Sequence, residues 1–194
     1  MLDLTLVVVA KDRKSMDQFK LDHVNPADLV LVVNSEGKPL SSIGNKYLDN
    51  SECAVFGLVH ADVVFGPGSL EVLLRTAAAG SVCGVVGRNP DISGERGYIW
   101  ANKNPGPVST LDSASCFFRR DLGLRFDEKT FDSFHLHVED LCIQAGQRGI
   151  PIVVPAADAY HDAHEVNGRL WLDQYWSYYP RLQAKWPGVR FGTT

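Results

Sequence analysis

Short runs of apolar, largely β-branched residues recur along the chain and are separated by polar segments. Most runs are continuously apolar rather than alternating, which is typical of strands covered on both faces of a parallel sheet. The expected strands of a central sheet are residues 4–9, 29–33, 54–59 and 150–154, with a further short strand at 82–86. Because helical segments alternate with these runs, the pattern predicts an α/β fold with a mainly parallel sheet.

Three of the intervening segments have the spacing of helices. Residues 12–28 are polar with a few spaced apolar positions and predict a crossover helix. Ser69 precedes an aliphatic run that Gly80 follows, which is the pattern of a capped helix with a glycine stop. Within residues 138–145 the apolar positions fall at i, i+3, i+4 and i+7, which predicts an amphipathic helix that ends at Gly149.

Two segments lack this regularity. Residues 87–108 are rich in Gly, Pro, Asn and Asp, with Tyr98 and Trp100 as isolated aromatic residues, and predict a loop or a long irregular hairpin. The segment from Arg169 to the end is rich in Trp and Tyr. Sugars stack on such side chains, but an aromatic helix more often packs on its own domain.

Composition narrows the class of protein. The 194 residues are 45% hydrophobic, which is ordinary for one globular domain and too high for intrinsic disorder. The net charge of −4 argues against a nucleic-acid partner. No run approaches the roughly 20 apolar residues that span a bilayer, and the first apolar run is interpreted as a strand and not as a signal peptide. Four widely spaced cysteines predict reduced, buried thiols, and we expect a cytoplasmic protein.

Asp62 is the first candidate for chemistry, because it follows the buried strand 54–59 directly. Open α/β sheets bind ligands beyond the carboxyl ends of their strands, where a carboxylate can hold a hard divalent cation against a diphosphate. The alternative is an aspartate that starts a turn and caps the following loop.

Glu139 and Asp140 are the second candidates, at the start of the helix expected after residue 137. The helix macrodipole favours ionised carboxylates in a first turn, and an ionised carboxylate is what a general base requires. Simple complementarity with the helix dipole would account for the same pair.

Histidines form the third candidate group. His135 and His137 alternate, so on an extended segment they share one face, and His161 follows the strand 150–154 after a short loop. Together with Asp62 they could form a zinc site, which would need three or four such ligands. His164 is expected to be an ordinary surface or partly buried residue, as most single histidines are.

The order of several sequence blocks is more specific than any single residue. They are 56–63 (FGLVHADV), 111–112 (LD), 116–120 (CFFRR), 126–128 (FDE), 134–135 (FH), 138–142 (VEDLC), 152–155 (IVVP) and 159–161 (AYH). In this order they resemble a family 2-like glycosyltransferase with the GT-A fold, in a branch whose usual Asp-x-Asp motif appears as His-x-Asp. Asn45 resembles the asparagine of the donor-side helix of that family.

This resemblance implies a three-layer GT-A-like sandwich over residues 1–194, with a donor half at 1–110 and an acceptor half at 111–194. It implies transfer of a sugar, with inversion, from a nucleoside diphosphate sugar to an acceptor hydroxyl. The expected donor is a UDP-sugar, and the acceptor is a glycan, a protein or a small molecule. Mn²⁺ or Mg²⁺ would stabilise the leaving diphosphate as a Lewis acid.

The implied site residues divide by role. Asp62 and His161 would bind the metal ion, and Asp140 would be the general base with Glu139 beside it. The positions expected to bind the nucleotide sugar are Ala10, Lys11, Asn34, Asn45, His60 and Asp62. Asp112 and His135 are expected on the acceptor side.

Two other classes of function stay open from the sequence. A metal-dependent hydrolase or nucleotidyltransferase could use Asp62 with His135, His137 and His161, and tightly held stoichiometric zinc would favour it. A non-catalytic module that binds nucleotide sugars or glycans is suggested by the short segment between residue 34 and Asp62, and hydrolysis of the donor would count against it. The oligomeric state is left open.

Overall fold

A computed structural model describes residues 3–19, 29–90, 96–162 and 168–190. Its main sheet has seven strands in the order β2-β1-β3-β10-β5-β11-β8. These are β2 (Leu29–Val33), β1 (Leu4–Ala10), β3 (Val55–His60), β10 (Ser115–Arg119), β5 (Val82–Cys83), β11 (Ile152–Val154) and β8 (Gly106–Pro107). Strands β10 and β8 run antiparallel to their neighbours, and the other five share one direction. The predicted α/β fold with a mainly parallel sheet is confirmed, and the runs at 4–9, 29–33, 54–59 and 150–154 all contribute strands to it.

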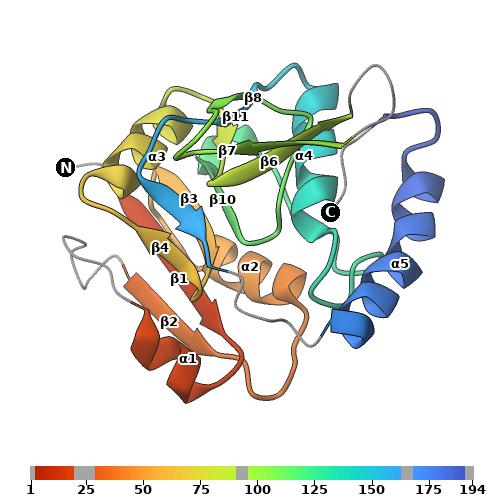
Figure 1. Cartoon of the computed structure of the whole chain (residues 1–194), viewed down its shortest axis with the longest axis horizontal. Coiled ribbons are helices and arrows are strands. Elements are labelled where there is room, and N and C mark those ends of the chain that lie inside the picture. Colours follow the sequence, from red (N-terminus) through yellow and green to blue (C-terminus); the bar gives the residue numbers. More distant parts are fainter. Residues whose placement is uncertain (1–2, 20–28, 91–95, 163–167, 191–194) are drawn as a thin grey trace.

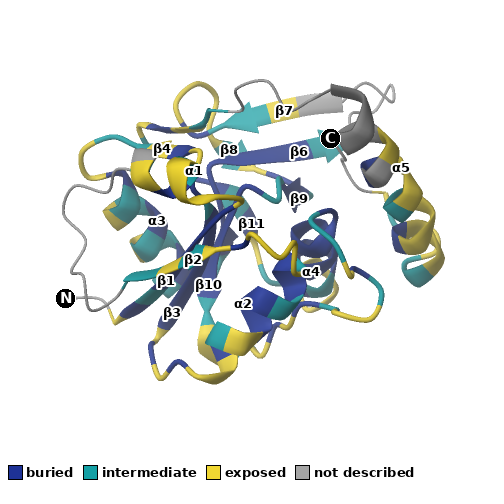
Figure 2. Cartoon of the chain, turned by 90° about the horizontal axis from the view of Figure 1, so that it is seen from below, coloured by how far each residue is buried: buried dark blue, intermediate teal, exposed yellow. Residues whose placement is uncertain are grey.

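Helices cover both faces of the sheet. They are α1 (Arg13–Gln18), α2 (Leu40–Asp49), α3 (Ser69–Ala78), α4 (His137–Gln147) and α5 (Gly168–Lys185), with a 3₁₀ turn at Arg120–Leu122. Figure 2 shows α1 and α3 on one side of the sheet, α2 and α4 on the other, and α5 beyond α4. Among the described residues, no helix combines the length and the apolar character needed to cross a membrane.

Two small sheets lie beside the main one (Figure 1). Strand β4 (Val63–Phe65) pairs with β12 (Ala159–His161), and β6 (Val86–Pro90) lies between β7 (Arg96–Trp100) and β9 (Thr110–Leu111). The segment 87–108, expected as a loop or an irregular hairpin, contains the β6–β7 hairpin. Its residues 91–95 lie outside the described part of the chain.

The helix boundaries depart from the predictions at two places. The crossover helix expected over 12–28 is described only as α1, which ends at Gln18, and residues 20–28 lie outside the described chain. Ser69 is not the cap of α3 but its first residue, and its hydroxyl donates to the carbonyl of Asp158 (2.8 Å) instead of capping the helix. The cap is Gly68, whose φ of 74° suits a glycine.

The core is built around the central strands, where backbone and rings approach closely. A Cβ atom at Gly57 would lie 2.7 Å from the ring of Phe117 on the neighbouring strand, so glycine is required at this point of β3. The four cysteines are free and buried, as the sequence predicted.

Candidate functional site

The carboxyl ends of three parallel strands meet at one edge of the sheet. The amide of Asn34, which follows β2, donates to the carbonyl of Ala10 at the end of β1 (2.8 Å). The amide of Ala61, which follows β3, donates to the carbonyl of Val9 (2.9 Å). Side chains that follow these strands are therefore gathered where open α/β sheets bind ligands.

Three side chains converge at the end of β3. His60, Asp62 and His161 each offer a ligand atom, and these atoms all lie within 4.8 Å of one another. His161 Nε2 is 3.3 Å from Asp62 Oδ2. Pairing of β12 with β4 brings His161 to this point, and the amide of Asp162 donates to the carbonyl of Asp62 (2.8 Å). We call His60, Asp62 and His161 the three-residue cluster.

The charges of the cluster favour a cation between its members. Burial keeps the pKa of His60 below its ordinary value, so its ring is neutral. Burial disfavours the ionised form of Asp62, but the hydrogen bond with His161 and the charges of His161 and His60 together outweigh it and lower the pKa of this carboxyl. Burial likewise disfavours the charged form of His161, but Asp62 and Asp112 together raise its pKa. Neutral imidazoles and an ionised carboxylate are metal ligands, and a cation would displace the proton shared by Asp62 and His161.

Asp112 stands directly behind the cluster. One of its carboxylate oxygens lies 4.0 Å from His161 Nδ1, on the opposite ring edge from Asp62, and its side chain is 17% exposed. The amide of Ala114 donates to the same carboxylate (2.8 Å) and fixes its position. A carboxylate near the second nitrogen of a metal-binding histidine orients the ring and raises its basicity.

Behind Asp112, Glu139 is buried in the interior of the protein, and we call Asp112 and Glu139 the carboxyl row. Its carboxyl accepts a hydrogen bond from the hydroxyl of Ser113 (2.9 Å), next to Asp112 in the chain. Burial and the negative charge of Asp112 raise the pKa of Glu139 to about 8. Glu139 is therefore protonated at neutral pH and does not supply the ionised carboxylate that the sequence predicts for at least one of Glu139 and Asp140.

Asp140 is directed elsewhere, although it is adjacent to Glu139. Its side chain is fully buried and receives hydrogen bonds from Trp186 Nε1 (2.7 Å), Lys185 Nζ (3.0 Å) and Gln144 Nε2 (2.8 Å). Successive residues of a helix point about 100° apart, so only one of the two carboxylates can face the row behind the cluster. In the structure Glu139 occupies this position, whereas Asp140 is bound by side chains at the end of α5. The expectation that Asp140 reaches an acceptor hydroxyl is therefore not supported.

His135 and His137 are core residues. Burial lowers the pKa of His135 to about 4 and that of His137 to about 3, so both rings are neutral at pH 7. His135 packs on Tyr175 and His137 on Phe126, with ring centroids 6.0 and 5.8 Å apart. Neither belongs to the set that could share an ion within the described chain, so the zinc site expected with His135 and His137 is not formed.

Several predicted ligand-binding positions have structural partners. Asn45 donates to the carbonyl of Phe126 (2.8 Å) and to Glu128 (2.7 Å), so it fastens α2 to a loop. Asn34 lies at the expected edge of the sheet, but its amide closes a turn on Lys38. Lys11 is exposed just after β1, whereas Ala10 is buried and offers only its backbone.

Two further results concern His60 and His164. The metal was assigned to Asp62 and His161, and the structure adds His60, which was expected only to bind the nucleotide sugar. The sequence contained a signal for this role of His60, because a His-x-Asp spacing at the end of a strand places two potential metal ligands within one turn. His164 lies outside the described residues.

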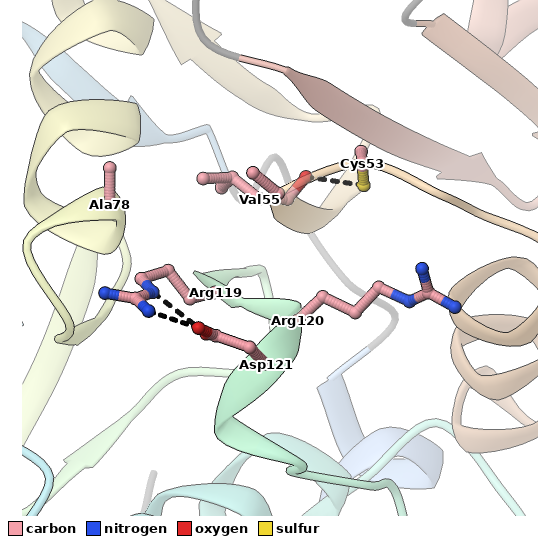
Figure 3. A pocket seen from close by; sticks show the side chains of 7 residues that line it. Cys53, Val55, Ala78, Arg119, Arg120 and Asp121 are labelled. Carbon is pink, nitrogen blue, oxygen red and sulfur yellow. Dashed lines mark hydrogen bonds and ion pairs between the residues drawn. The ribbon is translucent and has the colours of Figure 1, made fainter.

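A separate cavity lies at the other end of β3. It has a volume of about 670 Å³ and is lined by Cys53, Ala54, Val55, Ala78, Arg119, Arg120 and Asp121. Val55 begins β3 and His60 ends it, so the cavity and the cluster are at opposite ends of the sheet. Arg119 pairs with Asp121, and Arg120 points to the other side (Figure 3). This cavity shares no residue with the cluster.

The chain is similar to known proteins in structure, at low sequence identity. No protein-family model and no curated protein matches it. It is similar to the crystal structure of A197 from STIV, with 16% sequence identity and a TM-score of 0.47 over 81% of this chain and 85% of that one. It is also similar to the inositol-1-phosphate CTP transferase from T. maritima, with 13% identity and a TM-score of 0.38 over 95% of this chain and 78% of that one.

Proposed function

We propose that the protein is a glycosyltransferase that uses a divalent cation to move a sugar from a nucleoside diphosphate sugar to an acceptor hydroxyl. The observation that carries the proposal is the three-residue cluster of His60, Asp62 and His161 at the carboxyl end of β3. Two further strand ends adjoin it, as a nucleotide site in an open α/β sheet requires. The sequence blocks that resemble a GT-A glycosyltransferase supply the reaction class.

The residues of the cluster fit a divalent cation. Two imidazoles and one carboxylate are donors that Mn²⁺ accepts, and the ionised Asp62 is the donor that Mg²⁺ prefers. A cation bound there would offset the charge that develops on a leaving diphosphate. His60 is held neutral by burial, so it can donate its lone pair without first losing a proton.

We assign the general base to Asp112 in place of Asp140. Asp112 is partly exposed and lies beside His161, so an acceptor hydroxyl next to the cluster can reach its carboxylate. Asp140 is fully buried and paired with Lys185, so an acceptor hydroxyl cannot reach its carboxylate. Glu139 stays protonated behind Asp112, so the row carries one negative charge rather than two.

The proposal is tested by binding measured without an acceptor. Calorimetry would follow Mn²⁺ alone, then UDP with and without Mn²⁺, for the parent protein and for Asp62→Asn. We expect the variant to bind Mn²⁺ at least about tenfold more weakly, because even partners outside the ligand shell cost that much. Asp17→Asn, which removes an exposed carboxylate on α1, is the matched control and should bind as the parent does. Equal affinity of parent and Asp62→Asn for Mn²⁺ and for UDP would remove the basis of the proposal.

A metal-dependent hydrolase is the second candidate, and the composition of the cluster favours it. Two histidines and one carboxylate are the ligand set of several catalytic zinc sites, which keep one position open for water. Metal analysis of the purified protein separates the candidates. One tightly held zinc ion per chain, together with no binding of UDP, would favour the hydrolase over the transferase.

A further inference from the structure

Strand β2 forms one edge of the main sheet, and its outer side is open. Within the described part of the chain, β1 is the only strand that pairs with it (Figure 1). Its residues, Leu29–Val33, are all aliphatic, although an exposed edge is usually protected from pairing by charged residues or proline. Leu31 is 53% exposed and Val33 is 37% exposed, and both side chains lie on one face of the strand. We call the outer side of Leu29–Val33 the open edge.

The backbone groups that face the open edge follow from the pairing of β2 with β1. The amide of Asn34, which follows β2, donates to the carbonyl of Ala10 in β1 (2.8 Å). Backbone groups point to alternate sides along a strand, so those of Leu29, Leu31 and Val33 face away from β1. The open edge therefore presents the N–H and C=O groups of these three residues.

A second copy of the same strand satisfies all of these groups. In an antiparallel pair centred on Leu31, the two Leu31 residues exchange N–H···O=C bonds, and Leu29 of each copy does the same with Val33 of the other. Every outward backbone group of both edges is then paired. The same register brings the two Leu31 side chains together and places Val33 beside Leu29, so the exposed aliphatic groups cover one another.

Other occupants fit the open edge less well. The opposite edge of the main sheet is β8, which is two residues long and contains Pro107, so β2 of one copy cannot extend the sheet through β8 of another. The open edge carries no charge, so it offers a charged peptide no ionic partner. Two identical apolar edges, in contrast, meet without repulsion between like charges. The chemistry of the edge therefore favours a second copy of this chain.

We propose that the protein forms a two-fold symmetric dimer through antiparallel pairing of β2 with β2 of a second copy. The main sheets of the two copies then continue across the two-fold axis. The contact is small, because a standard interface buries about 800 Å² per partner and this one involves a strand of five residues. We therefore expect a weak dimer, with a dissociation constant on the order of 10–100 µM. The dimer uses no residue of the three-residue cluster, so it goes beyond the proposed function and does not depend on it.

Sedimentation velocity, from tenfold below to tenfold above this constant, measures the dimer. We expect the average mass of the parent protein to rise from that of a monomer towards twice that value. Leu31→Lys places two like charges at the two-fold axis and should weaken the dimer at least tenfold. Val64→Lys, which changes another exposed aliphatic side chain on β4 (37%), is the matched control and should behave as the parent does. A parent protein that stays monomeric over the whole range, or a Leu31→Lys variant that dimerises equally well, overturns the proposal.

Cysteine cross-linking tests the register. The two Cα atoms of Leu31 would be about 5.5 Å apart across the axis, which suits a disulfide. The two Cα atoms of Val33 would be more than about 13 Å apart, because the strands run in opposite directions. Oxidation should therefore give a covalent dimer of Leu31→Cys and not of Val33→Cys, with little background from the four buried cysteines. Equal cross-linking of the two variants, or none of Leu31→Cys, overturns the symmetric pairing, while the metal test of Asp62→Asn is unaffected.

Discussion

Replacing Glu139 by glutamine is expected to change how the free energy of unfolding depends on pH. Glu139 is 3% exposed, and its pKa is raised from the ordinary value of 4.5 to about 8 by burial and by the charge of Asp112. The unfolded chain releases this proton near pH 4.5, whereas the folded protein keeps it up to about pH 8. Between these values the folded state holds one proton more, so its stability decreases as pH rises.

The size of the effect follows from the two pKa values. The stabilising contribution of the Glu139 proton is complete below pH 4.5 and is lost as pH rises to about 8. One pKa unit corresponds to about 1.4 kcal/mol, so the parent protein loses about 2.5 kcal/mol from this group between pH 5 and pH 7. Glutamine stays neutral in both states and still accepts the hydrogen bond of Ser113. Other titrating groups are common to both proteins and cancel in the difference.

Urea unfolding at half-unit steps from pH 5 to pH 8 measures this difference. With a slope of about 2–3 kcal/mol per molar urea, the midpoint of Glu139→Gln should gain about 1 M relative to the parent between pH 5 and pH 7. Glu52→Gln, which removes an exposed carboxylate, is the control and should follow the parent. A difference between parent and Glu139→Gln that stays within about 0.5 kcal/mol across this range would refute the assigned protonation state.

Three further predictions concern residues near Glu139. His137→Phe should reduce acid sensitivity: burial lowers the pKa of His137 to about 3, so the unfolded chain binds a proton below pH 6.5 that the folded protein refuses. Unfolding curves should show a loss between pH 6.5 and 4.5 that is about 2–3 kcal/mol smaller than in the parent. Lys185→Met should lower the free energy of unfolding by about 3–5 kcal/mol, since Asp140 is left buried with less compensation, while Lys129→Met on the surface should cost little. Asp112→Asn should reduce turnover by about 10²–10⁴-fold with donor affinity retained, once an acceptor is known; equal turnover of parent and variant would exclude Asp112 as base.

The strands could be predicted because their signal is local. Runs such as 4–9 and 54–59 are apolar without alternation, and this pattern alone indicates that both faces of each strand are covered. The same runs locate the ends of parallel strands, and so the sequence identified Asp62. His161 was identified because the block 159–161 resembles the glycosyltransferase family. The pairing of β12 with β4, which places His161 beside Asp62, is a tertiary contact that the local sequence does not predict.

The orientation of α4 could not be predicted in this way. The apolar spacing within 138–145 indicates a helix, but it does not say which of Glu139 and Asp140 faces the cluster. That choice depends on Lys185 and Trp186, which lie about 45 residues further along the chain and hold Asp140 through side-chain hydrogen bonds. The β6–β7 hairpin was predicted only in part, because the segment 87–108 indicated a loop or an irregular hairpin without defining its strands.

Helix α4 joins the C-terminal helix to the candidate site through two adjacent carboxyl groups that have different partners. Lys185 needs the Asp140 carboxylate as its partner, and Glu139 keeps its proton because burial and the negative charge of Asp112 raise its pKa. Both requirements are met only if α4 keeps its present rotation, since a turn of about 100° would exchange the two side chains. It would then leave Lys185 without its carboxylate partner and bring that carboxylate next to Asp112. The packing of α5 therefore fixes the charge behind His161, and α5 belongs to the support of the site even though none of its described residues is a member of the cluster.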